Sequence, residues 1–117
     1  MRENDLVDRT KKFAIDCWFL CDKLPNSRGF NAYANQLIRC SSSVGANYRA
    51  SQRAKSAKDF INKLKIVEEE IDESVYFLEL LMAISTSFNQ EISKLHKEAK
   101  ELLAIIVASI KTSKAKL

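Results

Sequence analysis

The residue types in this chain best suited to catalysis or metal binding are one histidine and three cysteines. His96 lies within a predicted amphipathic helix, and the residue three positions before it is Ser93. A di-iron bundle needs two Glu-x-x-His pairs, so even one such pair is missing. Cys17 and Cys21 are four residues apart on one predicted helix, which suits a metal pair, but the chain has too few soft ligands to complete a site. We interpret these residues as packing or solvated groups and expect no metal and no cofactor.

An acidic run and a serine run are the other candidates for chemistry. The acidic residues within 68–73 could hold magnesium, but we favour a solvated face or a row of salt-bridge partners. The serines at 41–43 have no histidine base at a known motif spacing, so we interpret them as packing residues. We therefore expect no catalytic residues and predict that the protein is not an enzyme.

Basic residues offer a stronger hypothesis. Residues 1–67 contain 13 Lys and Arg against 6 Asp and Glu, whereas residues 68–117 contain 6 against 9. Arginine forks suit phosphate, and several phosphate contacts add up to useful affinity at low salt. The candidate nucleic-acid site comprises Arg39, Arg49, Arg53, Lys55, Lys58 and Lys63. The alternative is that these cations pair with Glu69, Glu70 and Glu73, within the bundle or between subunits.

The elements that position these residues are predicted to be four helices in one domain spanning residues 1–117. Two glycines and one proline in 117 residues suit helices joined by short turns. Apolar residues recur at alternating steps of three and four, the spacing of one helical face. The predicted helices are 5–24, 30–51, 56–85 and 88–112, the last opening with a capping box at Ser87. The predicted architecture is an all-α, antiparallel up-and-down four-helix bundle.

The second predicted helix has small residues in its C-terminal half, among them Gly45 and Ala46. Glycine inside a helix costs about 1 kcal/mol relative to alanine. The usual compensation is close approach of another backbone, so we expect this half of the helix to cross a neighbour tightly.

The third predicted helix has a second apolar face about 120° from its core stripe. A helix in a monomeric bundle should carry one apolar and one polar face, so a second apolar face implies a second burial partner. The alternative is one wide stripe buried inside a single bundle. Ile15, Trp18 and Phe19 also lie off the core stripe of their helix, as flank packing or as a contact with another subunit. The candidate oligomer interface comprises Ile66, Phe77, Leu80 and Ile84.

The expected cellular location follows from the membrane-spanning and secretion signals that the sequence lacks. No apolar run approaches the roughly 20 residues needed to span a bilayer. The first twelve residues contain no apolar core of a secretion signal, and an odd number of cysteines suits reduced thiols. We expect a cytoplasmic protein with no membrane partner.

The stretch from Gln36 to Leu81 resembles a known family. Its features are Gln36-Leu37-x-Arg39, Ser43-Val44-x-Ala46-Asn47, Ser56-x-x-Asp59-Phe60, and Glu69-Glu70 followed by Glu73-Ser74. Similar features occur in the small bacterial four-helix-bundle proteins encoded in intervening sequences of 23S ribosomal RNA genes. The resemblance implies a homopentamer, and most members have no established biochemical activity. The family is also similar to the accessory protein of diversity-generating retroelements, which binds nucleic acid and a reverse transcriptase.

Two functional hypotheses follow. The first is a non-enzymatic oligomeric binding or scaffold module, whose partners are further copies of the chain and a second protein. The alternative is an accessory protein that binds RNA or single-stranded DNA through its backbone, using the basic face. Arg39 and Asn47 match the family pattern, and we expect them to form a polar network with Glu69 and Glu73 that joins the second and third helices.

Overall fold

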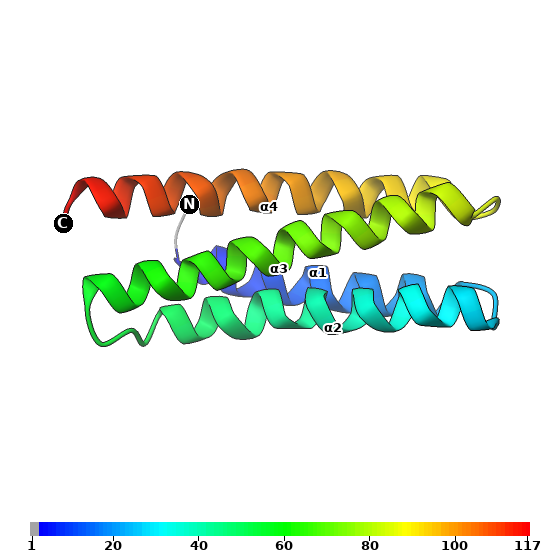
Figure 1. The fold of residues 1–117 in the computed structure, drawn as a ribbon, viewed down its shortest axis with the longest axis horizontal. Helices are drawn as coiled ribbons and strands as arrows, with labels where there is room; N and C mark the ends of the chain where they lie inside the picture. Colours follow the sequence, from blue (N-terminus) through cyan, green and yellow to red (C-terminus); the bar gives the residue numbers. More distant parts are fainter. Residues whose placement is uncertain (1–2) are drawn as a thin grey trace.

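The computed structural model describes residues 3–117 as four long helices joined by short turns. The helices are α1 (Glu3–Lys23), α2 (Arg28–Ser51), α3 (Ala57–Ile84) and α4 (Asn89–Ala115). They run alternately up and down in a bundle of 47 × 20 × 20 Å (Figure 1). The predicted all-α four-helix architecture is confirmed.

Each helix packs against two others and none against its diagonal. Helix α2 contacts α1 and α3, and α4 contacts α3 and α1, whereas the backbones of α1 and α3 do not meet. The turns α1–α2 and α3–α4 therefore lie at one end of the bundle, and the turn α2–α3 lies at the other end (Figure 1). Helices α1 and α3 consequently run in the same direction.

The helix ends lie within three residues of the predicted ones, and serine caps account for two of the differences. Helix α2 begins at Arg28 rather than residue 30, because Ser27 accepts a hydrogen bond from the backbone N–H of Phe30. The predicted capping box at Ser87 is wrong. Ser85 Oγ instead accepts from the N–H of Phe88 at 3.2 Å, and α4 begins at Asn89 without a side-chain cap.

The start of α3 forms as its sequence predicts. Ser56 Oγ accepts from the N–H of Asp59 at 3.1 Å, and Asp59 Oδ2 accepts from the N–H of Lys55 at 3.0 Å. The backbone N–H of Lys55, with the ammonium of Lys63, lowers the pKa of Asp59. The first bond satisfies a donor that the helix N-terminus leaves open, and the second ties the residue before the cap to the first turn of α3.

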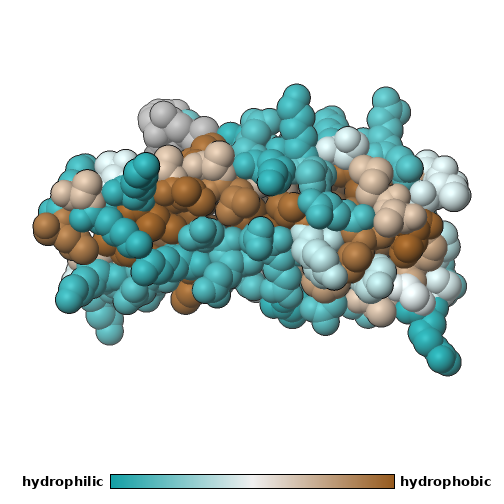
Figure 2. Space-filling model, turned by 45° about the horizontal axis from the view of Figure 1, so that its top comes forward, coloured by the Kyte–Doolittle hydropathy of each residue, from teal (hydrophilic) through white to brown (hydrophobic). Residues whose placement is uncertain are grey.

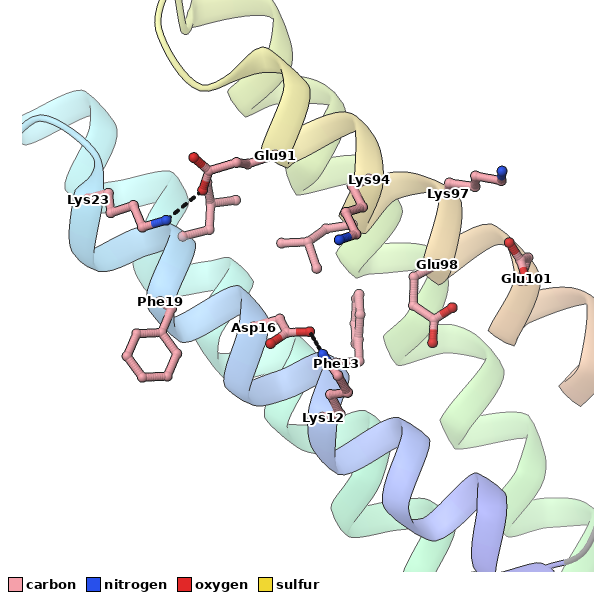
Figure 3. Close-up of a pocket in the computed structure, with 12 residues that line it drawn as sticks. Lys12, Phe13, Asp16, Phe19, Lys23, Glu91, Lys94, Lys97, Glu98 and Glu101 are labelled. Carbon is pink, nitrogen blue, oxygen red and sulfur yellow. Dashed lines mark hydrogen bonds and ion pairs between the residues drawn. The ribbon is translucent and has the colours of Figure 1, made fainter.

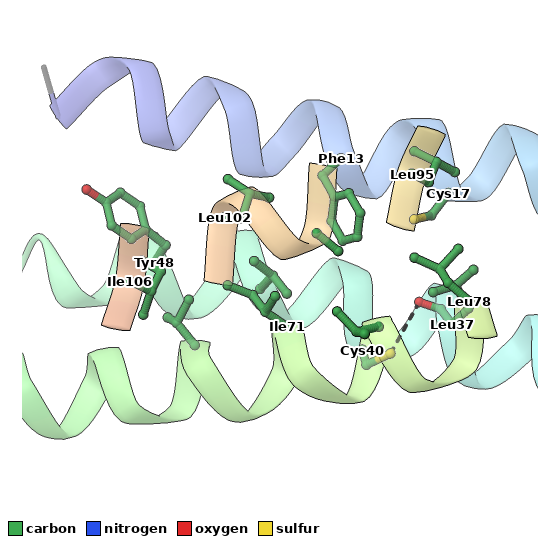
Figure 4. Packing of buried hydrophobic residues seen from close by; sticks show 14 of the residues in the cluster. Phe13, Cys17, Leu37, Cys40, Tyr48, Ile71, Leu78, Leu95, Leu102 and Ile106 are labelled. Carbon is green, nitrogen blue, oxygen red and sulfur yellow. Dashed lines mark hydrogen bonds between the residues drawn. The ribbon is translucent and has the colours of Figure 1, made fainter. Parts of the chain in front are cut away.

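The core consists of one apolar stripe from each helix (Figure 4). Phe13, Leu37, Ile71 and Leu102 are almost completely buried near its middle. The predicted stripe of α1 is buried along its whole length, at Leu6, Thr10, Phe13, Cys17, Leu20 and Leu24. Sustained heptad spacing thus identifies the core positions because it keeps each stripe facing the bundle axis.

Small polar residues in the core satisfy themselves on their own helices. Thr10 Oγ1 donates to the carbonyl of Leu6 at 2.7 Å, and Ser74 Oγ donates to the carbonyl of Glu70 at 2.8 Å. Within the described part of the chain, no buried side-chain nitrogen or oxygen lacks a hydrogen bond. The buried serines of α2 do the same, since Ser41 donates to the carbonyl of Ile38 and Ser51 to that of Tyr48, so they pack in the core without an unpaired polar group.

Gly45 lies against the backbone of α1. A methyl group built on Gly45 would lie 3.4 Å from Thr10 Oγ1 and 3.5 Å from the Thr10 carbonyl carbon, which is ordinary contact. The close crossing expected of α2 is therefore with α1.

No helix between residues 3 and 117 is both long enough and apolar enough to cross a membrane.

Replacing Gly45 should affect stability according to the size of the new side chain. Gly45→Ala should raise the free energy of unfolding by up to about 1 kcal/mol, because the methyl fits and alanine favours the helix. Gly45→Leu should lower it by roughly 1–3 kcal/mol, because the side chain would push α1 away. Urea unfolding followed by circular dichroism measures both. Ala104→Leu, at an exposed position of α4, is the matched control. Equal effects of Gly45→Leu and Ala104→Leu would contradict the close crossing.

Candidate functional site

One arginine on the surface of α2 forms ion pairs with two glutamates of α3. Arg39 of α2 donates from Nη1 to Glu70 Oε2 at 3.3 Å and from Nη2 to Glu73 Oε1. Its Nε donates to Gln36 Oε1 on the same helix at 3.3 Å. The hydrogen bond to Glu73 is the main cause that raises the pKa of Arg39. This cluster links α3 to α2 at the surface of the bundle.

The predicted polar network assembles only in part among these residues. Arg39 and Glu73 meet as expected, but Glu70 rather than Glu69 is the second carboxylate. Glu70 and Glu73 are one turn apart on the side of α3 that faces α2, whereas Glu69 points outward and is exposed. Asn47, which was also expected in the network, instead donates to the carbonyl of Ser43 on its own helix at 2.8 Å.

The second apolar face of α3 lies on the surface beside this cluster. Ile66 and Ile84 are exposed, while Phe77 and Leu80 are half-buried. Phe77 contacts Tyr33 of α2, with ring centroids 6.1 Å apart. The bundle thus covers part of this face with α2 and leaves the rest in water.

Tyr76 extends the same face and was missed from the sequence. Its side chain is 56% exposed, and its ring meets Phe77 edge to face with centroids 5.5 Å apart. An aromatic side chain at this exposure, next to Phe77, enlarges the apolar area that solvent meets. The adjacent Tyr-Phe pair outside the heptad was the available sequence signal.

A separate apolar patch covers the outside of α1. Trp18 is 49% exposed and Phe19 is 54% exposed, and their rings pack edge to face at 5.1 Å. Phe19 projects outward from α1 rather than toward α4 (Figure 3). Ile15 completes this patch and is also exposed. The bundle thus leaves about half of each of these three residues exposed.

Hydrophobic surface is also visible on the face toward α4. Figure 2 shows hydrophobic residues in a band along the long axis, bordered by hydrophilic side chains. On α4 itself, Val107 is exposed and Leu103 is half-buried. Apolar surface is therefore distributed around the bundle rather than confined to α3.

Helices α1 and α4 enclose a groove of about 640 Å³. Its lining combines apolar side chains, such as Phe13 and Leu95, with charged ones, including Glu98. Ion pairs span the groove at both ends. At one end Arg9 donates to Glu98 through Nε and Nη2, both at 2.7 Å. At the other end Lys23 donates to Glu91 at 2.8 Å (Figure 3). The groove is thus a seam between α1 and α4 held by charge pairs.

The six predicted nucleic-acid residues divide into two groups. Arg39 is paired with Glu70 and Glu73, and Lys63 Nζ donates to Asp59 Oδ1 at 2.9 Å. The other four side chains, those of Arg49, Arg53, Lys55 and Lys58, are exposed, and the described residues give them no ion-pair partner. Ten residues separate Arg39 from Arg49, about 15 Å along α2, so Arg39 lies apart from these four.

The candidate chemical residues are placed in ordinary packing environments. Burial raises the pKa of the Cys17 thiol and raises that of Cys21 to about 12, so both thiolates are disfavoured. Cys40 donates weakly to the carbonyl of Leu37 (Figure 4). His96 Nε2 lies 2.9 Å from Glu79 Oε2 on the surface. Within residues 3–117, no three potential metal ligands converge.

Comparison with known proteins identifies the family. A sequence model of the 23S rRNA-intervening sequence proteins matches residues 2–108. The chain belongs to this family. The resemblance carried by the motifs between Gln36 and Leu81 is therefore confirmed. No curated protein matches the chain.

A solved structure supports the same assignment. It is the crystal structure of a protein of unknown function from the S23 ribosomal protein family of Bacteroides thetaiotaomicron. The two chains are 31% identical and superpose with a TM-score of 0.85. The match covers 95% of this chain and 99% of that one, so the four helices correspond along nearly their whole length.

The seam between α1 and α4 gives a testable contribution to stability. Arg9→Met should lower the free energy of unfolding by about 1 kcal/mol. This value lies in the upper part of the range for surface ion pairs, because the guanidinium donates two hydrogen bonds to Glu98. Lys12→Met removes an ion pair within α1 alone and should cost much less. Chemical denaturation of both variants measures the difference, and equal losses would mean that Arg9 does not hold the seam.

Proposed function

We propose that this 23S rRNA-intervening sequence protein is a non-enzymatic homo-oligomer, a pentamer, that acts in the cytoplasm as a binding or scaffold module. The supporting observation is the outer face of α3, where Ile66, Tyr76 and Ile84 are exposed beside Phe77 and Leu80. Apolar side chains exposed on one side of a folded bundle favour an interaction site. The free thiols of the three cysteines suit a reducing compartment.

The Arg39 cluster also fits an interface of this kind. Its ion pairs with Glu70 and Glu73 lie on the same side of α3 as Ile66 and Phe77. Protein interfaces commonly surround an apolar centre with polar groups that are already satisfied. Arg39 would then hold the two helices at a fixed spacing while the apolar side chains make the contact.

A second candidate function is binding of RNA or single-stranded DNA. It is favoured by the exposed cluster of Arg49, Arg53, Lys55 and Lys58. The C-terminal end of α4, with Lys111 and Lys114, lies at the same end of the bundle as this cluster (Figure 1). An oligomer would repeat this basic end in every subunit, and repeated weak phosphate contacts multiply affinity.

Light scattering after size exclusion tests the oligomer. The parent chain should elute with five times the mass of one chain. Ile84→Lys should reduce that mass, because a charge in a desolvated contact is costly. Ser93→Lys, at an exposed polar position of α4, should leave the mass unchanged. A parent chain that is monomeric at micromolar concentrations would contradict the proposed oligomer.

Fluorescence anisotropy with a labelled single-stranded RNA tests the basic end. Binding should weaken steeply as salt rises, because neutralised phosphates release their counterions. Arg49→Ala with Arg53→Ala should reduce the slope of log affinity against log salt by about 0.7 for each phosphate that is no longer neutralised. Lys97→Ala with Lys100→Ala is the control. It removes the same amount of charge from the first half of α4, away from the basic end, and should have less effect. Affinity indifferent to salt and to the arginine changes would rule out this site.

A further inference from the structure

Two columns of side chains outside the core have the same layout, and all six residues are exposed except Leu80, which is half-buried. On α1, Lys11, Ile15 and Phe19 follow one another at steps of four residues, and we name them the α1 column. On α3, Asp72, Tyr76 and Leu80 do the same, and we name them the α3 column. Residues four apart lie one turn above each other on the same face of a helix. Each column thus has one charged residue followed by two apolar ones.

The two columns lie at the same height along the bundle. Ile15 is eight residues before Lys23, the last residue of α1, and Tyr76 is eight residues before Ile84, the last residue of α3. Both are therefore about 12 Å from the helix end. These two helix ends lie at the same end of the bundle, and the helices run in the same direction (Figure 1). Lys11 and Asp72 consequently share a level one turn further along.

The columns cannot cover each other within one copy. Helices α1 and α3 are diagonal in the bundle, and their backbones do not meet. Ile15 and Tyr76 are 45% and 56% exposed. The described residues also provide no ion-pair partner for Lys11 or Asp72. In a single chain the charged members therefore have no opposite charge among the described residues, and the apolar members keep part of their surface in water.

We propose that copies of the chain associate side by side through unlike faces, with the α1 column of one copy against the α3 column of the next. We call this a head-to-tail contact. The arrangement rests on the proposed oligomer and names its two contacting surfaces. A rotation about an axis parallel to the bundle brings the columns together at one level. Ile15 then faces Tyr76, Phe19 faces Leu80, and Lys11 faces Asp72. Unlike surfaces that meet without an axial shift close into a ring when the rotation between neighbouring copies divides a full turn, as a pentamer requires.

Charge favours this pairing over a parallel contact between two identical columns. Side-by-side α1 columns in parallel would place lysine against lysine, and α3 columns would place aspartate against aspartate. The head-to-tail contact places opposite charges together and covers both apolar surfaces with one kind of interface. Like charges brought together at an interface are penalised strongly enough to exclude a wrong pairing.

Mixing two single variants tests the pairing by light scattering after size exclusion. Ile15→Glu disables the α1 column and Tyr76→Glu disables the α3 column, and each variant alone should be monomeric. An equal mixture should form a particle of two chains, because one intact α1 column and one intact α3 column remain. Both substituted positions are exposed, and circular dichroism checks that each variant keeps its helices.

Charge reversal tests the register independently. Lys11→Glu or Asp72→Lys alone should lower the oligomeric fraction, and both changes in one chain should restore it. An oligomeric parent whose Ile15→Glu variant keeps its mass, or a variant mixture that stays monomeric, would overturn the head-to-tail pairing while leaving the oligomer standing. A monomeric parent chain would instead overturn the oligomer itself.

Discussion

Burial of one apolar stripe from each helix is the constraint on which the rest of this bundle depends. The stripes centred on Phe13, Leu37, Ile71 and Leu102 fill the space between four antiparallel helices. Once they are placed, the rotation of every helix about its own axis is fixed. That rotation decides which other side chains face a neighbour and which face water. Gly45 against Thr10, and Arg39 against Glu73, follow from it as secondary contacts.

The same constraint leaves apolar side chains that the core cannot accommodate. Each helix has one face toward the axis, so Trp18 on α1 and Tyr76 on α3 must lie outside. Their exposure would be costly in a lone bundle and becomes useful when another surface covers them. The distribution of charge is consistent with this division, since the pairs at Arg9 and Arg39 hold helices together within one chain.

The fold was predictable because heptad spacing is a property of the sequence itself, and the stripe of α1 is buried at each predicted position from Leu6 to Leu24. Details that depend on competing local groups were not predictable. Ser85 rather than Ser87 bonds the start of α4, because two serines two residues apart offer the same chemistry. Glu70 rather than Glu69 reaches Arg39, because neighbouring residues differ by 100° around the helix. The exposure of Tyr76 likewise depends on where Phe77 packs.

The central claim is that the apolar surface outside the core is covered in solution by another copy of the chain. Trp18 is the single tryptophan and flanks the α1 column, so its fluorescence reports on that surface directly. The decisive measurement is iodide quenching of Trp18 in the assembled protein. Burial in a contact predicts blue-shifted emission that iodide quenches poorly. Red-shifted emission that iodide quenches freely would show that Trp18 stays in water and would contradict the claim.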